Sequence, residues 1–296
     1  MATKVGFIGL GKMGRPMTER LLGAGFEVSV FNRSRGPVEE LAAKGAQPAS
    51  SAAEVAERSD VVLTALPTPD SVEQVYLEML TRAHPGQIYA DHSTVSVGQS
   101  RHCAEKMRER GAGFLDAPVS GGPAGAQAGT LTVMVGGDQA TFDRALPVLR
   151  AFGKNIRLCG PAGAGQVVKL INQLLVGVHT AAIAEAAVFG AKLGANPQVV
   201  LEVIGTSFGG STMMTRNLPR FISRDFAPAT SVTLLLKDLG VIHDEAKAAN
   251  VPLFLGAVAE QRFLEARARG MGENDMATLV RLWEDSAGVT VDKPRS

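Results

Sequence analysis

The stretch KVGFIGLGKMGRPM, residues 4–17, decides the fold of this chain. Its apolar run, Val5–Ile8, predicts a short strand, and a G-x-G-x-x-G follows at once and leads into a helical pattern. The motif consists of Gly9, Leu10, Gly11, Lys12, Met13 and Gly14. A second strand pattern, Val28–Phe31, then completes the order strand, glycine turn, helix, strand. Three glycines alone are weak evidence, but in this order they predict a dinucleotide site more strongly than a structural turn.

Each glycine has its own expected use in such a site. Gly9 permits the tight turn, Gly11 lets a pyrophosphate approach the backbone, and Gly14 lets the helix pack on the strand. The phosphates would then lie against the free N–H groups at the positive end of the helix dipole.

Strand and helix patterns alternate up to about residue 160, which predicts a mostly parallel, doubly wound sheet. From Gln166 to Gly194 a single helical pattern of about 29 residues would span about 43 Å at 1.5 Å per residue. Beyond it only helical patterns remain, with breaks expected at turn residues that include Pro219. We therefore predict an α/β Rossmann-type domain over residues 1–163, a long interdomain helix over 164–194 and an all-α domain over 195–296.

The composition predicts an ordinary globular enzyme. Hydrophobic residues make up 45% and charged residues 20%, and the net charge of +1 with no long basic run makes nucleic acid an unexpected partner. Cys103 and Cys159 are expected to be buried, reduced thiols, and no Cys/His cluster indicates a metal. The chain enters its first strand without a signal peptide, so we expect a cytoplasmic protein. The apolar stretch Leu174–Leu193 contains charged residues and is interpreted as a helix buried in protein, not in a membrane.

Two further segments could carry chemistry. Ser120, Gly121 and Gly122 follow a predicted strand, and their hydroxyl and backbone N–H groups could converge on an anion. A glycine-rich turn without a ligand explains the same pattern equally well. Lys169 has apolar neighbours, and partial burial would lower its pKa toward the range that suits proton transfer. Spacing alone nevertheless favours a lysine that reaches water.

Five ordered motifs resemble the β-hydroxyacid dehydrogenases, the family of 3-hydroxyisobutyrate dehydrogenase, tartronate semialdehyde reductase and the glyoxylate/succinic semialdehyde reductases. They are GFIGLGKMGRPM, DHST (91–94), DAPVSGGPAGAQAGTL (116–131), GPAGAGQVVKLINQ (160–173) and LLKDLG (235–240). The resemblance implies that Lys169 is the catalytic proton donor and acceptor, and that Ser120, Gly121 and Gly122 hold a substrate carboxylate. It also implies that Thr94 lies where nicotinamide meets substrate, that Leu66 and Pro67 line the cofactor cleft, and that Lys237 closes over the site. A homodimer or homotetramer is implied as well.

The sequence departs from the family pattern after the lysine. Many members carry Asn at the fourth position after it, whereas this chain has Gln173 there and Asn172 at the third. The polar partner on the substrate side is therefore Asn172 or Gln173. A second departure, Thr230 where an aromatic residue is common, leaves the substrate unnamed beyond a small carboxylic acid.

The residues after the second strand favour NADP, with NAD possible. An NAD site usually places Asp or Glu there to bind the ribose 2′-hydroxyl, but this chain has Asn32, Arg33 and Ser34. A carboxylate would repel a 2′-phosphate, whereas these side chains can bind one through charge-assisted hydrogen bonds. A solvated basic loop is the alternative for this segment.

The sequence thus predicts an oxidoreductase that transfers a hydride between NADP(H) and a small 3-hydroxy (or 4-hydroxy or 2-hydroxy) acid and its aldehyde or keto acid. Two alternatives stay open: an imine reductase, and a non-catalytic nucleotide-sensing module. Both kinds of relative tend to lack a lysine at the place of Lys169, so its presence argues against them.

Overall fold

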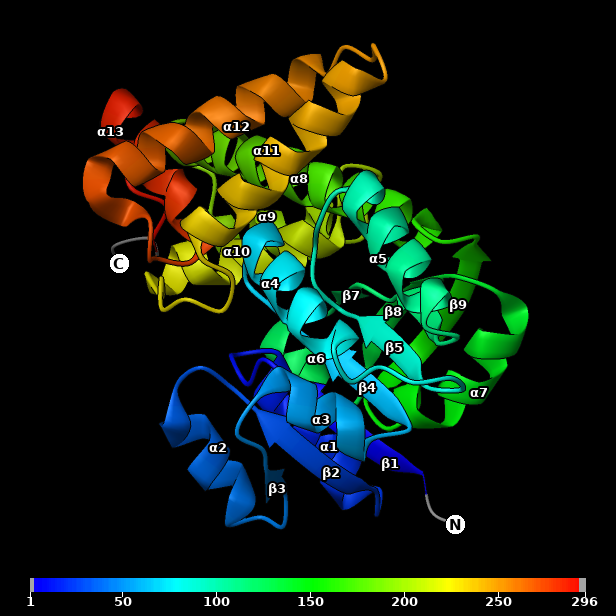
Figure 1. The fold of residues 1–296 in the computed structure, drawn as a ribbon. Helices are drawn as coiled ribbons and strands as arrows, with labels where there is room; N and C mark the ends of the chain where they lie inside the picture. The colour runs from blue at the N-terminus through cyan, green and yellow to red at the C-terminus, as the bar shows by residue number, and fades with distance from the viewer. Residues whose placement is uncertain (1–2, 293–296) are drawn as a thin grey trace. The chain divides into compact units, whose positions relative to one another are not determined.

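The computed structural model describes residues 3–292, and the chain divides into two compact units after Lys169. The first unit alternates strands and helices (Figure 1): β1 (Lys4–Ile8), α1 (Gly14–Gly23), β2 (Glu27–Phe31), α2 (Arg35–Ala42), β3 (Gln47–Pro48), α3 (Ala52–Arg58), β4 (Val61–Thr64), α4 (Pro69–Leu80), β5 (Ile88–Asp91), α5 (Val97–Glu109), β6 (Gly113–Asp116), β7 (Val119–Ser120), α6 (Gly122–Ala128), β8 (Leu131–Gly136), α7 (Gln139–Leu149) and β9 (Gly153–Gly160). The domain limits expected from the sequence, at residues 163 and 194, stay a prediction.

Within the described residues, nine strands form one sheet in the order β3-β2-β1-β4-β5-β6-β8-β7, with β9 beside β8. The strands from β3 to β6 are parallel, whereas β8 runs antiparallel to β6 and β7. The predicted doubly wound, mostly parallel sheet is confirmed. Because β1 lies between β2 and β4, the strand order reverses there, and open α/β sheets bind ligands beside such a reversal, at the carboxyl ends of the strands.

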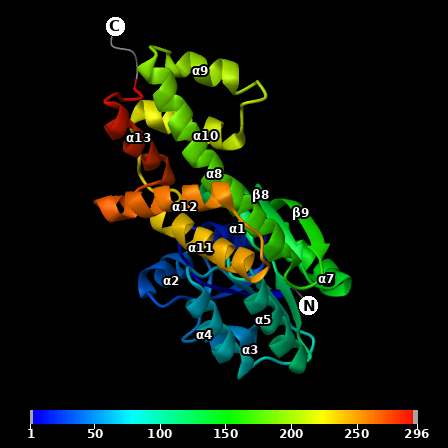
Figure 2. The same ribbon diagram turned by 90° about the horizontal axis from the view of Figure 1, so that it is seen from above.

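Helices cover both faces of this sheet. The core on one face includes Met17 of α1 and Leu149 of α7, and the core on the other includes Val55 of α3 and Met79 of α4. Figure 2 shows α3, α4 and α5 side by side, as does Figure 1. Strand side chains alternate between the two cores, and a sheet buried on both faces needs an apolar residue at nearly every strand position. That requirement explains the unbroken apolar runs in the sequence.

Within the described residues, the regular elements of the second unit are all helices or helical turns, as the sequence predicts. It comprises most of α8 (Ala164–Lys192), then α9 (Pro197–Ile204), α10 (Thr212–Ser223), α11 (Val232–Ala248), α12 (Phe254–Ala266), a π-turn (Arg267–Met271), a 3₁₀ turn (Met276–Leu279) and α13 (Val280–Ala287). Its core packs Val188, Leu218, Phe221 and Val280 together. Trp283, the single tryptophan of the sequence, donates its Nε1–H to Glu185 Oε2 at 3.1 Å.

Two local expectations are wrong. Pro219 does not end a helix. Helix α10 continues through it, and the adjacent Leu218 and nearby Phe221 are buried in the core. Packing of those side chains outweighs the one hydrogen bond that proline removes. Cys159 is exposed, not buried, because β9 pairs only with β8 at the sheet edge. Cys103 is buried as expected.

Helix α8 is long and apolar enough to cross a membrane by length and composition alone. The buried side chains of Gln166, Lys169 and Gln173 make hydrogen bonds within their own units, and such polar groups are costly in lipid. We therefore interpret α8 as a helix packed in protein.

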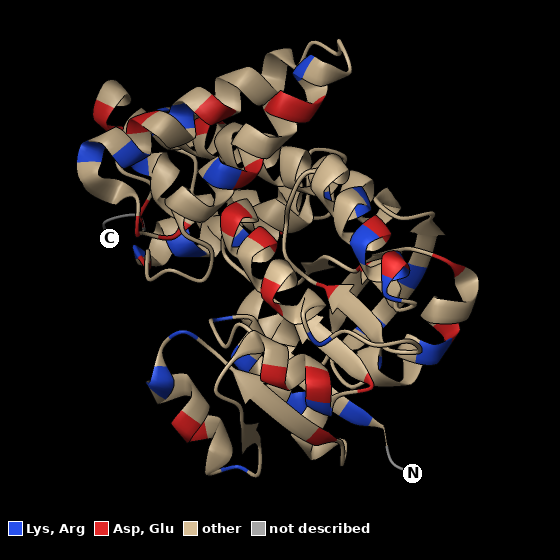
Figure 3. Ribbon diagram, in the orientation of Figure 1, with Lys and Arg blue, Asp and Glu red and all other residues tan. Residues whose placement is uncertain are grey.

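Figure 3 shows positive and negative residues interspersed along the helices of each unit.

Candidate active site

The glycine turn between β1 and α1 has the geometry that a dinucleotide needs. Gly9 has a φ of +93°, and a Cβ there would lie 2.3 Å from the carbonyl oxygen of Ala65. A Cβ on Gly14 would lie 1.8 Å from the carbonyl oxygen of Gly9, so α1 starts in direct contact with the turn. A Cβ on Gly11, in contrast, would meet no protein atom within 4 Å. Gly9 and Gly14 serve packing, and Gly11 leaves the backbone open, so these residues fit a pyrophosphate at the N-terminus of α1.

Asn32 ties the end of β2 to this turn. Its Oδ1 accepts a hydrogen bond from the backbone N–H of Leu10 at 3.0 Å, and its Nδ2 donates to the carbonyl oxygen of Ser34 at 3.0 Å. The next residue, Arg33, is exposed. Ser34 is the N-cap residue of α2, yet its hydroxyl makes no capping bond. The side chain of Asn32 is therefore engaged by the backbone, whereas Arg33 and Ser34 surround the N-terminus of α2.

The ends of β4 and β5 are held together by Asp91 and Ser93. Asp91 Oδ1 accepts hydrogen bonds from the hydroxyls of Thr64 at 2.7 Å and of Ser93 at 2.6 Å. The Ser93 hydroxyl oxygen in turn accepts from the backbone N–H of Leu66 at 2.9 Å. This network joins the Leu66–Pro67 loop to the segment that carries Thr94. Both were predicted to contact the cofactor, and both lie at carboxyl ends of neighbouring strands.

The start of α8 is fixed to β6 by Asp116. Its Oδ1 accepts from the backbone N–H of Gly163 at 2.7 Å, and its Oδ2 accepts from the backbone N–H of Gln166 at 2.8 Å. Burial raises the pKa of this carboxyl to about 6, against these two hydrogen bonds, which lower it. The side chain of Gln166 continues the connection, because its Nε2 donates to the carbonyl oxygen of Ser93 at 2.8 Å.

Lys169 lies one helical turn beyond this anchor and is almost fully buried, with 7% of its surface exposed. Its Nζ donates to the carbonyl oxygen of Val119 at 2.8 Å. Val119 precedes Ser120, and Gly121 and Gly122 follow with φ angles of +130° and +63°. The structure thus brings Lys169 to the strand end that carries the predicted carboxylate-binding residues. Spacing alone favoured a lysine that reaches water, and the burial of Lys169 shows that this alternative is wrong.

The second unit holds its own polar chain of predicted residues. Asn172 Nδ2 donates to Gln173 Oε1 at 2.9 Å, and Gln173 Nε2 donates to Asp238 Oδ2 at 2.5 Å. Lys237 Nζ lies 2.7 Å from Asp238 Oδ1. Gln173 therefore uses both ends of its amide within this unit, whereas Asn172 uses its nitrogen. Asp238 is buried, so Lys237 and Asp238 do not form the solvated surface pair that a Lys-Asp step on a helix usually makes.

Sequence reasoning missed the connecting residues Asp91, Ser93, Asp116, Gln166 and Asp238. All five occur in the motifs quoted above, but only their partners in space show what they do. Within the described residues, no group of three or more His, Cys, Asp and Glu side chains is arranged to hold a metal ion.

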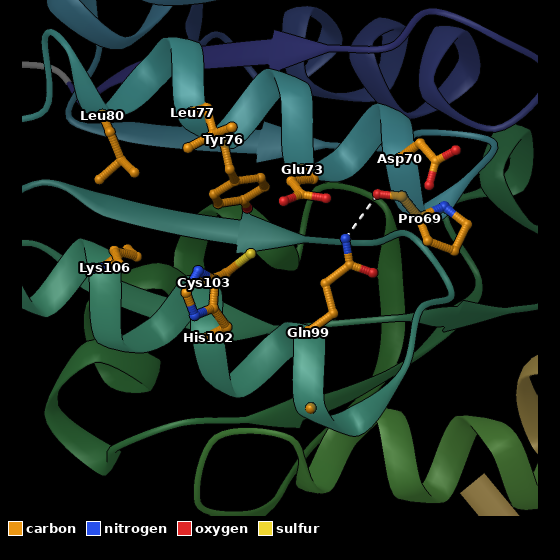
Figure 4. Close-up of a pocket in the computed structure, with 11 residues that line it drawn as sticks. Pro69, Asp70, Glu73, Tyr76, Leu77, Leu80, Gln99, His102, Cys103 and Lys106 are labelled. Atoms are coloured by element: carbon orange, nitrogen blue, oxygen red, sulfur yellow. Dashed lines mark hydrogen bonds between the residues drawn. The ribbon is translucent and has the colours of Figure 1, made fainter. Parts of the chain in front are cut away.

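A separate cavity of about 350 Å³ lies between α4 and α5 (Figure 4). The side chains of Tyr76 and Cys103 point toward each other in it, and Gln99 Nε2 closes one end by donating to the carbonyl oxygen of Pro69 at 2.7 Å. None of its lining residues is among the predicted site residues. This cavity is thus distinct from the candidate active site.

Comparisons with known proteins agree with this geometry. Residues 4–160 match the family model of the NAD binding domain of 6-phosphogluconate dehydrogenase, and residues 163–283 match that of the NAD-binding domain of NADP-dependent 3-hydroxyisobutyrate dehydrogenase. The chain is 42% identical to the 2-(hydroxymethyl)glutarate dehydrogenase of Eubacterium barkeri, with 97% of each chain covered. It is 37% identical to the NAD-dependent L-serine dehydrogenase of Pseudomonas aeruginosa, over 96% of this chain and 99% of that one. The solved 3-hydroxyisobutyrate dehydrogenase of Mycobacterium tuberculosis, in a structure with L-serine, matches with a TM-score of 0.88 and 37% identity, over 95% of this chain and 99% of that one.

Proposed function

Because this chain belongs to the β-hydroxyacid dehydrogenase family, an NAD(P)-dependent group of oxidoreductases, we propose that it interconverts a small hydroxy acid and its aldehyde or keto acid. We further propose NADP(H) as the preferred cofactor and Lys169 as the group that moves the proton. The protein is proposed to be cytoplasmic and a homodimer or homotetramer.

One observation carries the proposal for Lys169. Its ammonium group is buried and hydrogen-bonded to the carbonyl oxygen of Val119, beside Ser120. Burial of an amine away from water is costly to maintain, and proton transfer gives it a use. In the reductive direction Lys169 donates a proton to the carbonyl oxygen of the substrate, and in the oxidative direction it takes that proton back. The bound nicotinamide supplies or accepts the hydride.

The neighbouring residues are assigned to orientation. Ser120, Gly121 and Gly122 would bind the substrate carboxylate, so that the reacting carbon is placed consistently. The resemblance assigns Thr94 to the place where nicotinamide meets substrate, Leu66 and Pro67 to the cofactor cleft, and Lys237 to the cofactor. Of the two polar candidates, Asn172 is favoured for the substrate, because Gln173 uses both ends of its amide on Asn172 and Asp238.

The NADP preference rests on the end of β2. Arg33 and Ser34 lie at the N-terminus of α2, and no carboxylate stands at residues 32–34 to repel a 2′-phosphate. The family also contains a relative named as NAD-dependent, so the preference has to be measured.

The Lys169→Ala variant tests the function. We expect kcat to fall at least about 100-fold, as is typical when a general acid–base group is removed, while NADPH still binds. Lys192→Ala, on the last turn of the same helix, is the matched control and should keep the wild-type kcat. We would measure kcat with a panel of substrates that contains small semialdehyde acids, 2-(hydroxymethyl)glutarate and L-serine. A Lys169→Ala enzyme with more than about a tenth of the wild-type kcat would overturn the proton role. Turnover of cyclic imines in place of every acid would instead indicate an imine reductase.

A further inference from the structure

Lys169 belongs to a helix, α8, whose first turn is hydrogen-bonded both to the end of β6 and to the segment after β5. Asp116 is the last residue of β6, and its carboxylate accepts hydrogen bonds from two backbone N–H groups, those of Gly163 and Gln166. Gln166 reaches across to the segment after β5, where its Nε2 donates to the Ser93 carbonyl and its Oε1 accepts from the Val95 N–H at 3.4 Å. Both Asp116 and Gln166 have no exposed surface.

The packing beneath this turn leaves no room for displacement. A Cβ on Gly165 would lie 2.4 Å from the carbonyl oxygen of Met134 and 2.7 Å from that of Asp116. A Cβ on Gly136 would lie 2.4 Å from Asp116 Oδ1. The backbone of α8 therefore rests directly on the backbone of β6 and β8, and the Asp116 carboxylate fills the remaining space. Contacts this close fix the rotation and the height of the helix on the sheet.

We propose that Asp116 and Gln166 are positioning residues for Lys169, which hold the first turn of α8 so that the lysine amine stays beside Val119 and Ser120. Lys169 follows Gln166 by three residues, so any shift of the anchored turn moves the lysine with it. Displacement of a reacting group by about 1 Å can cost about 100-fold in rate. The inference rests on the proposed function, in which Lys169 moves the proton.

The chemistry of the two side chains fits this role. Asp116 offers two acceptor oxygens to two N–H donors, whereas an Asn in its place would offer one acceptor and turn its own N–H₂ toward a donor. Gln166 needs a donor for the Ser93 carbonyl and an acceptor for the Val95 N–H. A Glu at this position keeps the acceptor but loses the donor. Asp116→Asn and Gln166→Glu are therefore nearly isosteric changes that break identified bonds.

A double-mutant cycle separates positioning from a merely structural role. We expect Asp116→Asn and Gln166→Glu each to lower kcat about tenfold or more, with the Kd for NADPH, measured by fluorescence titration, changed less than about threefold. In the Lys169→Ala background the same changes should have no further effect on the residual rate, because the group they position is absent. Asp138→Asn is the matched control: Asp138 also caps a helix through Thr141, on α7, and its loss should leave kcat unchanged.

The outcomes discriminate between the two proposals. If Lys169→Ala keeps its rate, the proposed function fails and there is no lysine to position. If Lys169→Ala is inactive while folded Asp116→Asn and Gln166→Glu keep the wild-type kcat, or if their losses persist in the Lys169→Ala background, only the positioning role is overturned. Should Asp116→Asn fail to fold, the cycle with Gln166→Glu decides the question by the same two criteria.

Discussion

The side-chain oxygen of Asn32 accepts a hydrogen bond from the backbone N–H of Leu10 at 3.0 Å, while its amide nitrogen holds the carbonyl of Ser34. The residue at the end of β2 thus secures the glycine turn as well as the start of α2. An Asp at position 32 would keep the bond to Leu10 but could not donate to Ser34. Discrimination of the 2′-phosphate is therefore expected to depend on Arg33 and Ser34 more than on the amide of Asn32.

Replacing Arg33 by Ala should damage the use of NADPH more than that of NADH. Losing a hydrogen bond to a charged group costs about 1.5–3 kcal/mol, or roughly 10–150-fold in the KM for NADPH. The KM values for both cofactors should be compared with those of Arg144→Ala, which removes an arginine from α7. Asn32→Asp should shift the preference in the same direction, because it adds a negative charge. Equal KM values for NADPH and NADH in the wild-type enzyme would contradict the NADP preference.

Replacing Ser120 by Ala should harm acidic substrates selectively. If this loop binds the carboxylate, semialdehyde acids are reduced at least about tenfold more efficiently by kcat/KM than simple aldehydes of the same length. Ser120→Ala should narrow that ratio, whereas Thr132→Val, which removes the hydroxyl of the residue paired with it on β8, should not. The experiment compares succinic semialdehyde with butanal. A ratio near one that Ser120→Ala leaves unchanged would mean that the loop is a structural turn.

The raised pKa of Asp116 predicts how stability depends on pH. Its ordinary value is 3.8 and its value in the fold is about 6, so between these pH values the folded protein binds the proton more tightly than the unfolded chain. Protonation of Asp116 therefore stabilises the folded state. This stabilisation is fully present below about pH 4 and is lost as the pH rises through about 6. It amounts to an energy on the order of 3 kcal/mol. The nearby Asp91 acts in the same direction, since its charge also raises the pKa of Asp116.

Urea unfolding of the wild type and of Asp116→Asn isolates this effect, because Asn does not titrate. The wild type should lose stability relative to the variant between pH 4 and pH 6, and the difference should be constant above about pH 7. A wild type that keeps a constant stability relative to Asp116→Asn over this range, or that gains stability relative to it as the pH rises, would show that Asp116 is not protonated preferentially in the fold.

Alanine at two glycines of the same motif should affect different properties, stability at Gly14 and cofactor binding at Gly11. Gly14→Ala places a Cβ against the carbonyl oxygen of Gly9 and should lower the free energy of unfolding by about 1–3 kcal/mol. Gly11→Ala meets no protein atom, so stability should change by less than about 0.5 kcal/mol. The Kd for NADPH should nevertheless rise, because the methyl group would occupy the space that we propose for the pyrophosphate. Unchanged NADPH binding in Gly11→Ala would place the cofactor elsewhere.

The sequence was sufficient for the elements with strong periodic patterns. The helix expected at Gln166–Gly194 occurs as Ala164–Lys192, because a long apolar repeat follows a cluster of glycines. The two-residue strands β3 and β7 were not expected, since so short a segment has no periodicity to detect. The break expected at Pro219 does not occur, because α10 is held there by the burial of neighbouring side chains, a tertiary effect that the local sequence does not show.

The site was less accessible to local reasoning. The side chain of Lys169 is hydrogen-bonded to the carbonyl of Val119, fifty residues earlier. Asp116 holds the start of α8 through the N–H groups of Gly163 and Gln166, which are also distant in the sequence. No window of neighbouring residues contains such pairs. The family resemblance pointed to Lys169 without indicating what holds it in place.

The lone tryptophan gives the chain a built-in optical reporter with a defined location. Trp283 belongs to the helical unit, where its indole N–H bonds Glu185 and the guanidinium of Arg262 lies 4.9 Å from its ring. Its emission therefore reports the unfolding of that unit, whereas the fluorescence of NADPH bound at the proposed site would report the integrity of the glycine turn in the other. Each unit has its own buried core, so the two signals need not change at the same urea concentration. A single titration read at both wavelengths would show whether the enzyme unfolds in one step or two.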